Sequence, residues 1–297
     1  MTETTLALAE RIFLTVFPLF VIVLCGYFYG RRHRPDIEFA NRANMDLFIP
    51  ALIFHSMATQ TFPLVEYQQL ALGAVAVVLG SGLLLYPLVR LLNINVKTFL
   101  PPMMFNNSGN MGIPLIVLAF GEQALPAAVI LFIVENTLHM SVGALMLNRR
   151  TKLLQLLKMP MILATIAGIG WSASDLVLPK AVELPVQMLG QISIPLMLFT
   201  LGIRIVEVGL KSWHQGVLGA ILCPLSGVLI VLALQPWLAL SEQQFAILLV
   251  FGALPPAVLN YMMAERYQQE PHQVASIVLL GNIGALLIIP LVLIFAL

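Results

Sequence analysis

The chain has 297 residues, of which 60% are hydrophobic and 10% are charged, and this balance excludes an ordinary soluble domain. The formal net charge of +1 gives no reason to expect a nucleic-acid partner. Apolar runs of about 20 residues, the length that a membrane-spanning helix needs, recur along the chain. We therefore expect an all-α polytopic membrane protein.

The hydropathy pattern predicts ten membrane spans joined by short polar loops. In chain order, these spans cover residues 10–30, 43–59, 68–92, 97–121, 124–147, 158–178, 184–204, 213–236, 242–265 and 273–296.

The loops between the spans predict the orientation of the chain. The odd-numbered loops hold thirteen of the 15 Lys and Arg residues, and the opposite side keeps only Arg11 and Lys180. Because basic loops stay in the cytoplasm, both termini are expected to be extracytoplasmic. The thirteen residues are Arg31, Arg32, Arg34, Arg42, Arg90, Lys97, Arg149, Arg150, Lys152, Lys158, Arg204, Lys211 and Arg266.

The fourth span contains a polar stretch that an unbroken membrane helix would not carry. Residues 106–114 read Asn-Asn-Ser-Gly-Asn-Met-Gly-Ile-Pro between two apolar runs. Gly frees the backbone and Pro removes an amide donor, so the helix is expected to unwind here and to restart at Pro114. The positive dipole end of the restarting helix suits an anion. The stretch predicts half of a substrate site, made by Asn106, Asn107, Ser108, Asn110, Gly112 and Pro114. The alternative is that these amides only cap broken helix ends.

Three short sequence features of the first half of the chain recur in the second half in the same order, at offsets of about 140 to 147 residues. Five spans per half is an odd number, so the second half must cross the membrane in the opposite sense. We expect two inverted five-helix repeats, residues 1–150 and 151–297, in which interrupted spans mark the binding site. The recurring features are Ile49-Pro50 with Ile194-Pro195, the interruption near Gly112 with Pro255-Pro256, and Glu135-Asn136 with Gly281-Asn282.

The ninth span would supply the other half of the substrate site through Pro255, Pro256 and Asn260. Asn260 follows Pro256 by four residues, about one turn into the second half-helix. A ligand role and an interhelical hydrogen bond are both open for this side chain.

Glu135 lies near the centre of the fifth span, where a carboxylate is costly unless it is neutralised, paired or hydrated. His139 follows four residues later on the same helix face, so the two side chains can pair or share a proton. One hypothesis is an ion-coupling site for H⁺ or Na⁺, which would include Asn136 and Asn282. The other is a buried structural network of the same residues.

Two stretches resemble the crossover motifs of the auxin efflux carrier family. Residues 107–115 are similar to the crossover of that family's fourth helix, and residues 252–256 are similar to the crossover of its ninth helix. The resemblance continues through residues 264–271 and covers the whole chain in span number and order. It matches Asn107 to the Asn that holds a substrate carboxylate.

The resemblance implies the fold of the bile-acid–sodium symporters, with broken, crossing fourth and ninth helices. Helices one, two, six and seven would form a scaffold, and helices three, four, five, eight, nine and ten a core domain. Family substrates are organic anions, namely auxin in plants and malonate or similar carboxylates in some bacteria. The long loop of the long plant carriers is missing between Asn148 and Lys158, which favours a compact bacterial-type carrier in the inner membrane.

The sequence thus predicts a secondary transporter of small organic anions, with no cofactor and no metal site beyond a possible coupling ion. A homodimer through the scaffold helices is a further possibility. A transporter-like sensor or a channel is the main alternative. An intramembrane enzyme is disfavoured because the sequence contains no HExxH, GxSxG or Asp-rich magnesium motif, and only Ser108 with His139 is left as a nucleophile–base pair.

Overall fold

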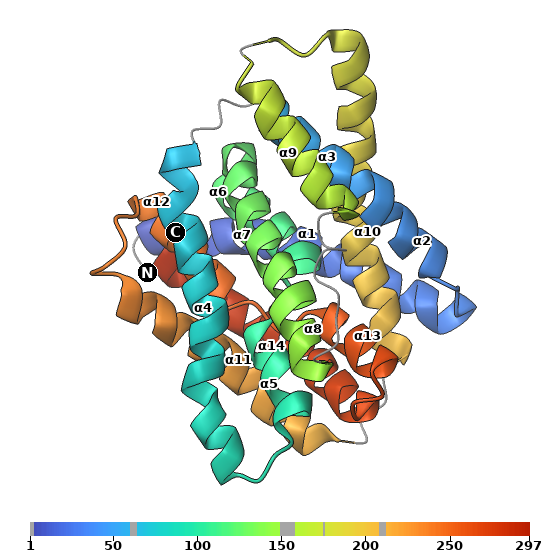
Figure 1. Ribbon diagram of the computed structural model, residues 1–297, viewed down its shortest axis with the longest axis vertical. Coiled ribbons are helices and arrows are strands. Elements are labelled where there is room, and N and C mark those ends of the chain that lie inside the picture. Colours follow the sequence, from blue (N-terminus) through green and yellow to red (C-terminus); the bar gives the residue numbers. More distant parts are fainter. Residues whose placement is uncertain (1–2, 60–63, 149–157, 175, 208–211) are drawn as a thin grey trace.

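The computed structural model describes residues 3–59, 64–148, 158–174, 176–207 and 212–297, and these ranges fold into helices joined by short connections (Figure 1). The α-helices are α1 (Glu3–His33), α2 (Glu38–Ala43), α3 (Ile49–Thr59), α4 (Leu64–Leu91), α5 (Val96–Met104), α6 (Ile113–Phe120), α7 (Leu125–Leu138), α8 (Ala144–Leu147), α9 (Pro160–Ser172), α10 (Lys180–Glu207), α11 (Trp213–Leu234), α12 (Glu242–Gly252), α13 (Val258–Arg266) and α14 (Pro271–Ala296). Three π-helical turns precede α3, α6 and α8, at Asn44–Phe48, Ser108–Gly112 and His139–Gly143.

Among the described residues, six helical segments are long and apolar enough to cross a membrane. They match the first, third, fifth, seventh, eighth and tenth predicted spans. The other four predicted spans consist of shorter pieces, namely α2 with α3, α5 with α6, α9, and α12 with α13. The ten-span count therefore stays a prediction. The six segments are Ala7–His33, Glu66–Leu91, Glu122–Leu147, Lys180–Arg204, Trp213–Leu234 and Pro271–Ala296.

The helices pack in two groups. In the first group, α1 lies along α10, and α3 packs between α9 and α10, as Figure 1 shows for α3 and α9. In the second group, α11 packs against α14, α4 and α12, while α4 also contacts α5 and α7. Small residues permit the closest approach, because a Cβ atom on Gly202 of α10 would lie 2.0 Å from the carbonyl oxygen of Val23 in α1.

Hydrogen bonds connect predicted loops of the same side. Asn95 of the third loop donates to Glu270 of the ninth loop, over 3.0 Å. Gln244, at the start of the ninth predicted span, donates to the carbonyl oxygen of Glu66 in the second predicted loop over 2.9 Å. Each bond thus joins two segments that the predicted order of spans places on the same side of the membrane. Of the basic loop residues, Arg149, Arg150, Lys152 and Lys211 lie outside the described part of the chain, as does the boundary at residues 150–151.

The fourth predicted span is interrupted at the start of the predicted stretch, and the interruption is shorter than the sequence predicted. The non-helical residues are 105–107, and the helix resumes at Ser108 rather than at Pro114. Gly112 has helical dihedral angles, φ −65° and ψ −51°, so it continues the helix instead of breaking it. The π-helical turn at Ser108–Gly112 changes the hydrogen-bond pattern just before Pro114 and so accommodates its missing donor.

Candidate substrate site at the two interrupted helices

The interrupted segments of the fourth and ninth predicted spans lie against each other. Asn106 and Pro256 form an antiparallel bridge. The N–H of Asn107 donates to the carbonyl oxygen of Pro255 over 2.7 Å, and the N–H of Ala257 donates to that of Phe105 over 3.0 Å. Backbone groups at membrane depth need hydrogen-bond partners inside the protein. Each interrupted segment therefore provides hydrogen-bond partners for backbone groups that the other segment no longer pairs within a helix.

Buried Asn side chains complete the repair of the freed carbonyl groups. Nδ2 of Asn106 donates to the carbonyl oxygen of Phe251 over 2.7 Å. Nδ2 of Asn260 donates to Phe105 over 2.8 Å and to Ala257 over 3.0 Å. The Oδ1 atoms of Asn106 and Asn260 have no hydrogen-bond partner among the described residues. These two amides therefore cap broken helix ends and still present a buried acceptor each.

Asn107 connects to the last helix through a side-chain hydrogen bond. Its Nδ2 donates to Oδ1 of Asn282 in α14 over 2.8 Å. Nδ2 of Asn282 in turn donates to the carbonyl oxygens of Pro256 over 3.0 Å and of Val278 over 2.8 Å. Asn282 thus orients Asn107 and holds the second interruption at the same time.

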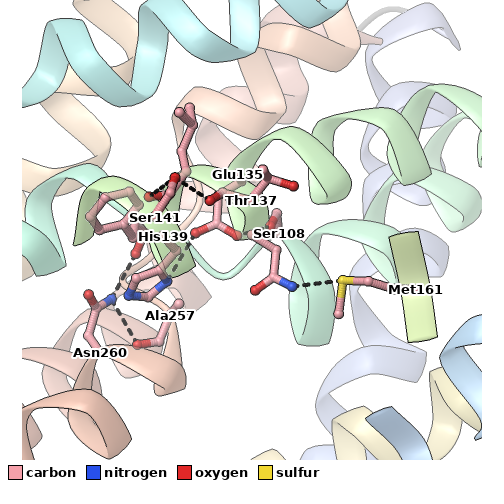
Figure 2. A network of polar contacts seen from close by, with 11 residues as sticks. Ser108, Glu135, Thr137, His139, Ser141, Met161, Ala257 and Asn260 are labelled. Atoms are coloured by element: carbon pink, nitrogen blue, oxygen red, sulfur yellow. Dashed lines mark hydrogen bonds and ion pairs between the residues drawn. The ribbon is translucent and has the colours of Figure 1, made fainter. Parts of the chain in front are cut away.

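Glu135 lies at the centre of a buried polar cluster (Figure 2). Oγ of Ser108 donates to its Oε2 over 2.9 Å. Nδ1 of His139 lies 3.3 Å from its Oε1, a close contact whose geometry falls short of a hydrogen bond. The predicted pairing of Glu135 with His139 at four-residue spacing is therefore confirmed as a contact. The His139 ring stacks on Phe105, with centroids 4.3 Å apart and planes 6° from parallel.

A polar cavity of about 140 Å³ lies beside these residues. Six of the predicted site residues line this polar cavity, namely Asn106, Asn107, Asn110, Glu135, Asn136 and His139. The first turns of both resumed helices also border it, through Gly109 and through Val258 and Leu259. First-turn N–H groups have no intrahelical acceptor and carry the positive end of the helix dipole, so two helix starts converge on this space.

The remaining predicted residues lie around the polar cavity without lining it. Ser108 contacts Glu135, while Pro255 and Pro256 supply carbonyl oxygens to Asn107 and Asn282. Gly112 and Pro114 are buried inside the resumed helix. Asn282 borders a separate, mainly apolar cavity of about 730 Å³ between α1, α10 and α14.

Three polar residues that the sequence did not single out also line the polar cavity. Arg204 comes from the last turn of α10, and Asn41 and Asn44 come from α2 and the turn that follows it. Nδ2 of Asn41 and Oδ1 of Asn44 have no hydrogen-bond partner among the described residues. Both Arg204 and Asn44 lie at a predicted span end, where polar residues are common and usually solvated. The sequence therefore gave no signal that they border a cavity, and only the fold shows it.

A comparison with protein-family models matches residues 11–155 and 150–293 to the family of membrane transport proteins. The chain belongs to this family. The family is that of the auxin efflux carriers, so the resemblance found in the two crossover motifs is confirmed. Membership identifies a multi-pass membrane transporter and agrees with the expectation that the chain is not an enzyme. No curated protein matches the chain.

Proposed function

We propose that the protein is a secondary transporter of small organic anions that works by alternating access. The observation that carries this proposal is the polar cavity, where two helix starts, several side-chain amides and the Arg204 guanidinium border one space. In this view the ten spans form two inverted five-helix halves. The fourth and ninth spans cross at the antiparallel contact between Asn106 and Pro256.

A carboxylate fits the chemistry of this cavity. First-turn N–H groups at Gly109 and Asn110 and the side-chain amides of Asn107 and Asn110 offer hydrogen-bond donors. Arg204 adds a guanidinium, the side chain best suited to hold a carboxylate in two parallel hydrogen bonds. Malonate, with two carboxylates on a short carbon chain, is the probe that we expect to fit.

The division of the cavity lining supports a moving core domain. Asn44 and Arg204 belong to the second and seventh spans, which are predicted to form the scaffold, and Asn41 lies in α2 just before the second span. Asn107, Glu135 and their neighbours belong to the predicted core. A shift of the core against the scaffold would separate these two sets and change the side from which the anion is accessible.

The coupling ion is proposed to be H⁺ rather than Na⁺. One oxygen of Glu135 accepts the Ser108 hydroxyl proton, and the other faces the His139 ring nitrogen. Both carboxylate oxygens therefore already face groups that can carry a proton, whereas Na⁺ would need several oxygen ligands turned toward it. Protonation of Glu135 would also remove a negative charge from beside an anion site.

The protein is proposed to reside in a bacterial inner membrane with both termini outside the cytoplasm. The basic ends of α1, α4 and α10 support this orientation, because Arg31, Arg90 and Arg204 all fall at predicted cytoplasmic span ends. A homodimer through the scaffold helices remains compatible with it.

The test is uptake of labelled malonate into proteoliposomes under an imposed pH gradient or sodium gradient. Saturable uptake that the pH gradient drives is expected for the unmodified protein, with a large loss in Asn107→Ala. Gln191→Ala, which changes an exposed amide of α10, is the matched control and should retain uptake. Glu135→Gln should lose the response to the gradient and keep malonate exchange at equal pH.

Other results would point elsewhere. If a wide panel of organic anions shows no saturable uptake or exchange, the transporter proposal fails and a sensor comes first. Uptake that does not saturate would indicate a channel. Full transport activity in Asn107→Ala would mean that the anion does not bind in the polar cavity.

A further inference from the structure

His139 lies between two cavities. It lines the polar cavity and also a side cavity of about 10 Å³, bordered by Lys97, Thr98, Gly143 and Asn260 among others. That volume is close to the roughly 10–15 Å³ that one water molecule requires. The side cavity is therefore a space for one water between His139 and the start of α5.

The side cavity has the polar groups that a water molecule needs. Oδ1 of Asn260 is an acceptor with no partner among the described residues, and Asn260 is 3% exposed. Thr98 contributes a hydroxyl and is fully buried. Nδ1 of His139 faces Glu135, which leaves Nε2 as the ring nitrogen for exchange on the other side.

Thr98 continues this path to the surface. Its hydroxyl donates to Oε2 of Glu270 and accepts from Nε2 of Gln269 over 2.9 Å. Glu270 is exposed and directly precedes α14, with a left-handed backbone conformation, φ 42°. Nδ2 of Asn95 donates to the same oxygen of Glu270 over 3.0 Å, so the carboxylate is held over the Thr98 hydroxyl.

From this arrangement we propose that a proton relay runs from Glu135 through His139, a water in the side cavity and Thr98 to Glu270. The relay rests on the proposed H⁺-coupled transport and adds a route by which the proton leaves the anion's cavity through His139 and the side cavity. A proton accepted at Nε2 gives the imidazolium ion, and loss of the Nδ1 proton to Glu135 returns a neutral ring. The same steps in reverse carry a proton out to Glu270.

The charged groups along this route are few among the described residues. Arg204 lines the polar cavity with Glu135 and His139, and Lys97 lines the side cavity. Nζ of Lys97 is directed to the carbonyl oxygen of Leu147 over 3.4 Å. Gly143 keeps the route open, because a Cβ atom there would lie 2.9 Å from Phe105 and 3.0 Å from Cδ2 of His139.

The test compares Thr98→Val with Thr200→Val in proteoliposomes that contain a pH-sensitive dye. Valine keeps the shape of threonine and removes the hydroxyl. Thr200 is also buried, but it donates to Leu196 within α10 and lines neither cavity. We expect Thr98→Val to lose malonate uptake driven by the pH gradient, together with the accompanying proton flux, and to retain malonate exchange at equal pH. Gly143→Ala, whose Cβ atom would press on the His139 and Phe105 rings, should act in the same way, and Thr200→Val should behave as the unmodified protein.

Three results would overturn the relay. If Thr98→Val takes up malonate under the pH gradient at the rate of the unmodified protein, protons take another path, although the proposal of H⁺-coupled transport is still supported. Loss of exchange together with uptake would make Thr98 a structural residue. If the unmodified protein neither takes up nor exchanges any anion, the transport proposal itself fails and the relay fails with it.

Discussion

The side-chain amide of Asn107 donates a 2.8 Å hydrogen bond to Oδ1 of Asn282, which lies 175 residues further along the chain. Asn107 lines the polar cavity, and Asn282 lines the apolar cavity between α1, α10 and α14. The same Asn282 caps the carbonyl oxygen of Pro256. One bond therefore joins the two cavities, both interruptions and the last helix.

Replacement of Asn282 by Ala is expected to lower stability. It leaves Nδ2 of Asn107 and the carbonyl oxygen of Pro256 buried without these partners, at a cost of about 1–3 kcal/mol for each unpaired group. Thermal unfolding in detergent would measure the loss, with Gln191→Ala as the exposed control. A melting temperature equal to that of the control would mean that water replaces the Asn282 amide.

The contact between Gly227 and Gly252 is expected to tolerate no side chain. A Cβ atom on Gly227 of α11 would lie 2.0 Å from the carbonyl oxygen of Gly252, where α12 ends. Because backbone rather than a flexible side chain is in the way, Gly227→Ala should destabilise by about 1–3 kcal/mol or more.

Gly170 offers the matched control for this substitution. A Cβ atom there meets nothing within 4 Å, and the residue is exposed in α9. Gly170→Ala should raise stability by roughly 0.5–1 kcal/mol, since Ala is the better helix former. Equal melting temperatures for the two variants would contradict the packing argument.

Arg204→Gln is expected to weaken binding of a dicarboxylate more than it slows transport at saturation. Loss of one charge-assisted hydrogen bond costs about 1.5–3 kcal/mol, so the half-saturation concentration for malonate should rise roughly 10- to 100-fold. Arg204→Lys should restore part of the affinity. Arg266→Gln removes an exposed cation at the end of α13, outside the polar cavity lining, and should have little effect. An unchanged half-saturation concentration in Arg204→Gln would place the anion away from α10.

Single cysteines can test the orientation of the chain. In a Cys25→Ser background, His33→Cys places a thiol at the basic end of α1, and Ser174→Cys places one just after the end of α9. Cys223 is buried and can remain. A membrane-impermeant maleimide should label residue 33 only in inside-out vesicles and residue 174 only in right-side-out vesicles. The reverse pattern would place both termini in the cytoplasm.

The sequence by itself determined the features that depend on local composition and spacing. Apolar runs identify the membrane helices, because a span needs about 20 apolar residues. The four-residue spacing of Glu135 and His139 predicted their contact, because one helix face carries both. The two crossover motifs identified the family, which the family comparison confirmed.

Only the tertiary structure decided which distant groups meet. Asn106 reaches the carbonyl oxygen of Phe251, and Asn260 that of Phe105, across more than a hundred residues of sequence. Arg204 joins the polar cavity because α10 passes beside the π-helical turn Ser108–Gly112. The helix resumes at Ser108 rather than at Pro114 because groups on the opposite segment satisfy the freed backbone at residues 105–107. Local sequence shows which backbone groups will need a hydrogen-bond partner. Which residue provides that partner depends on how helices far apart in the chain cross in space.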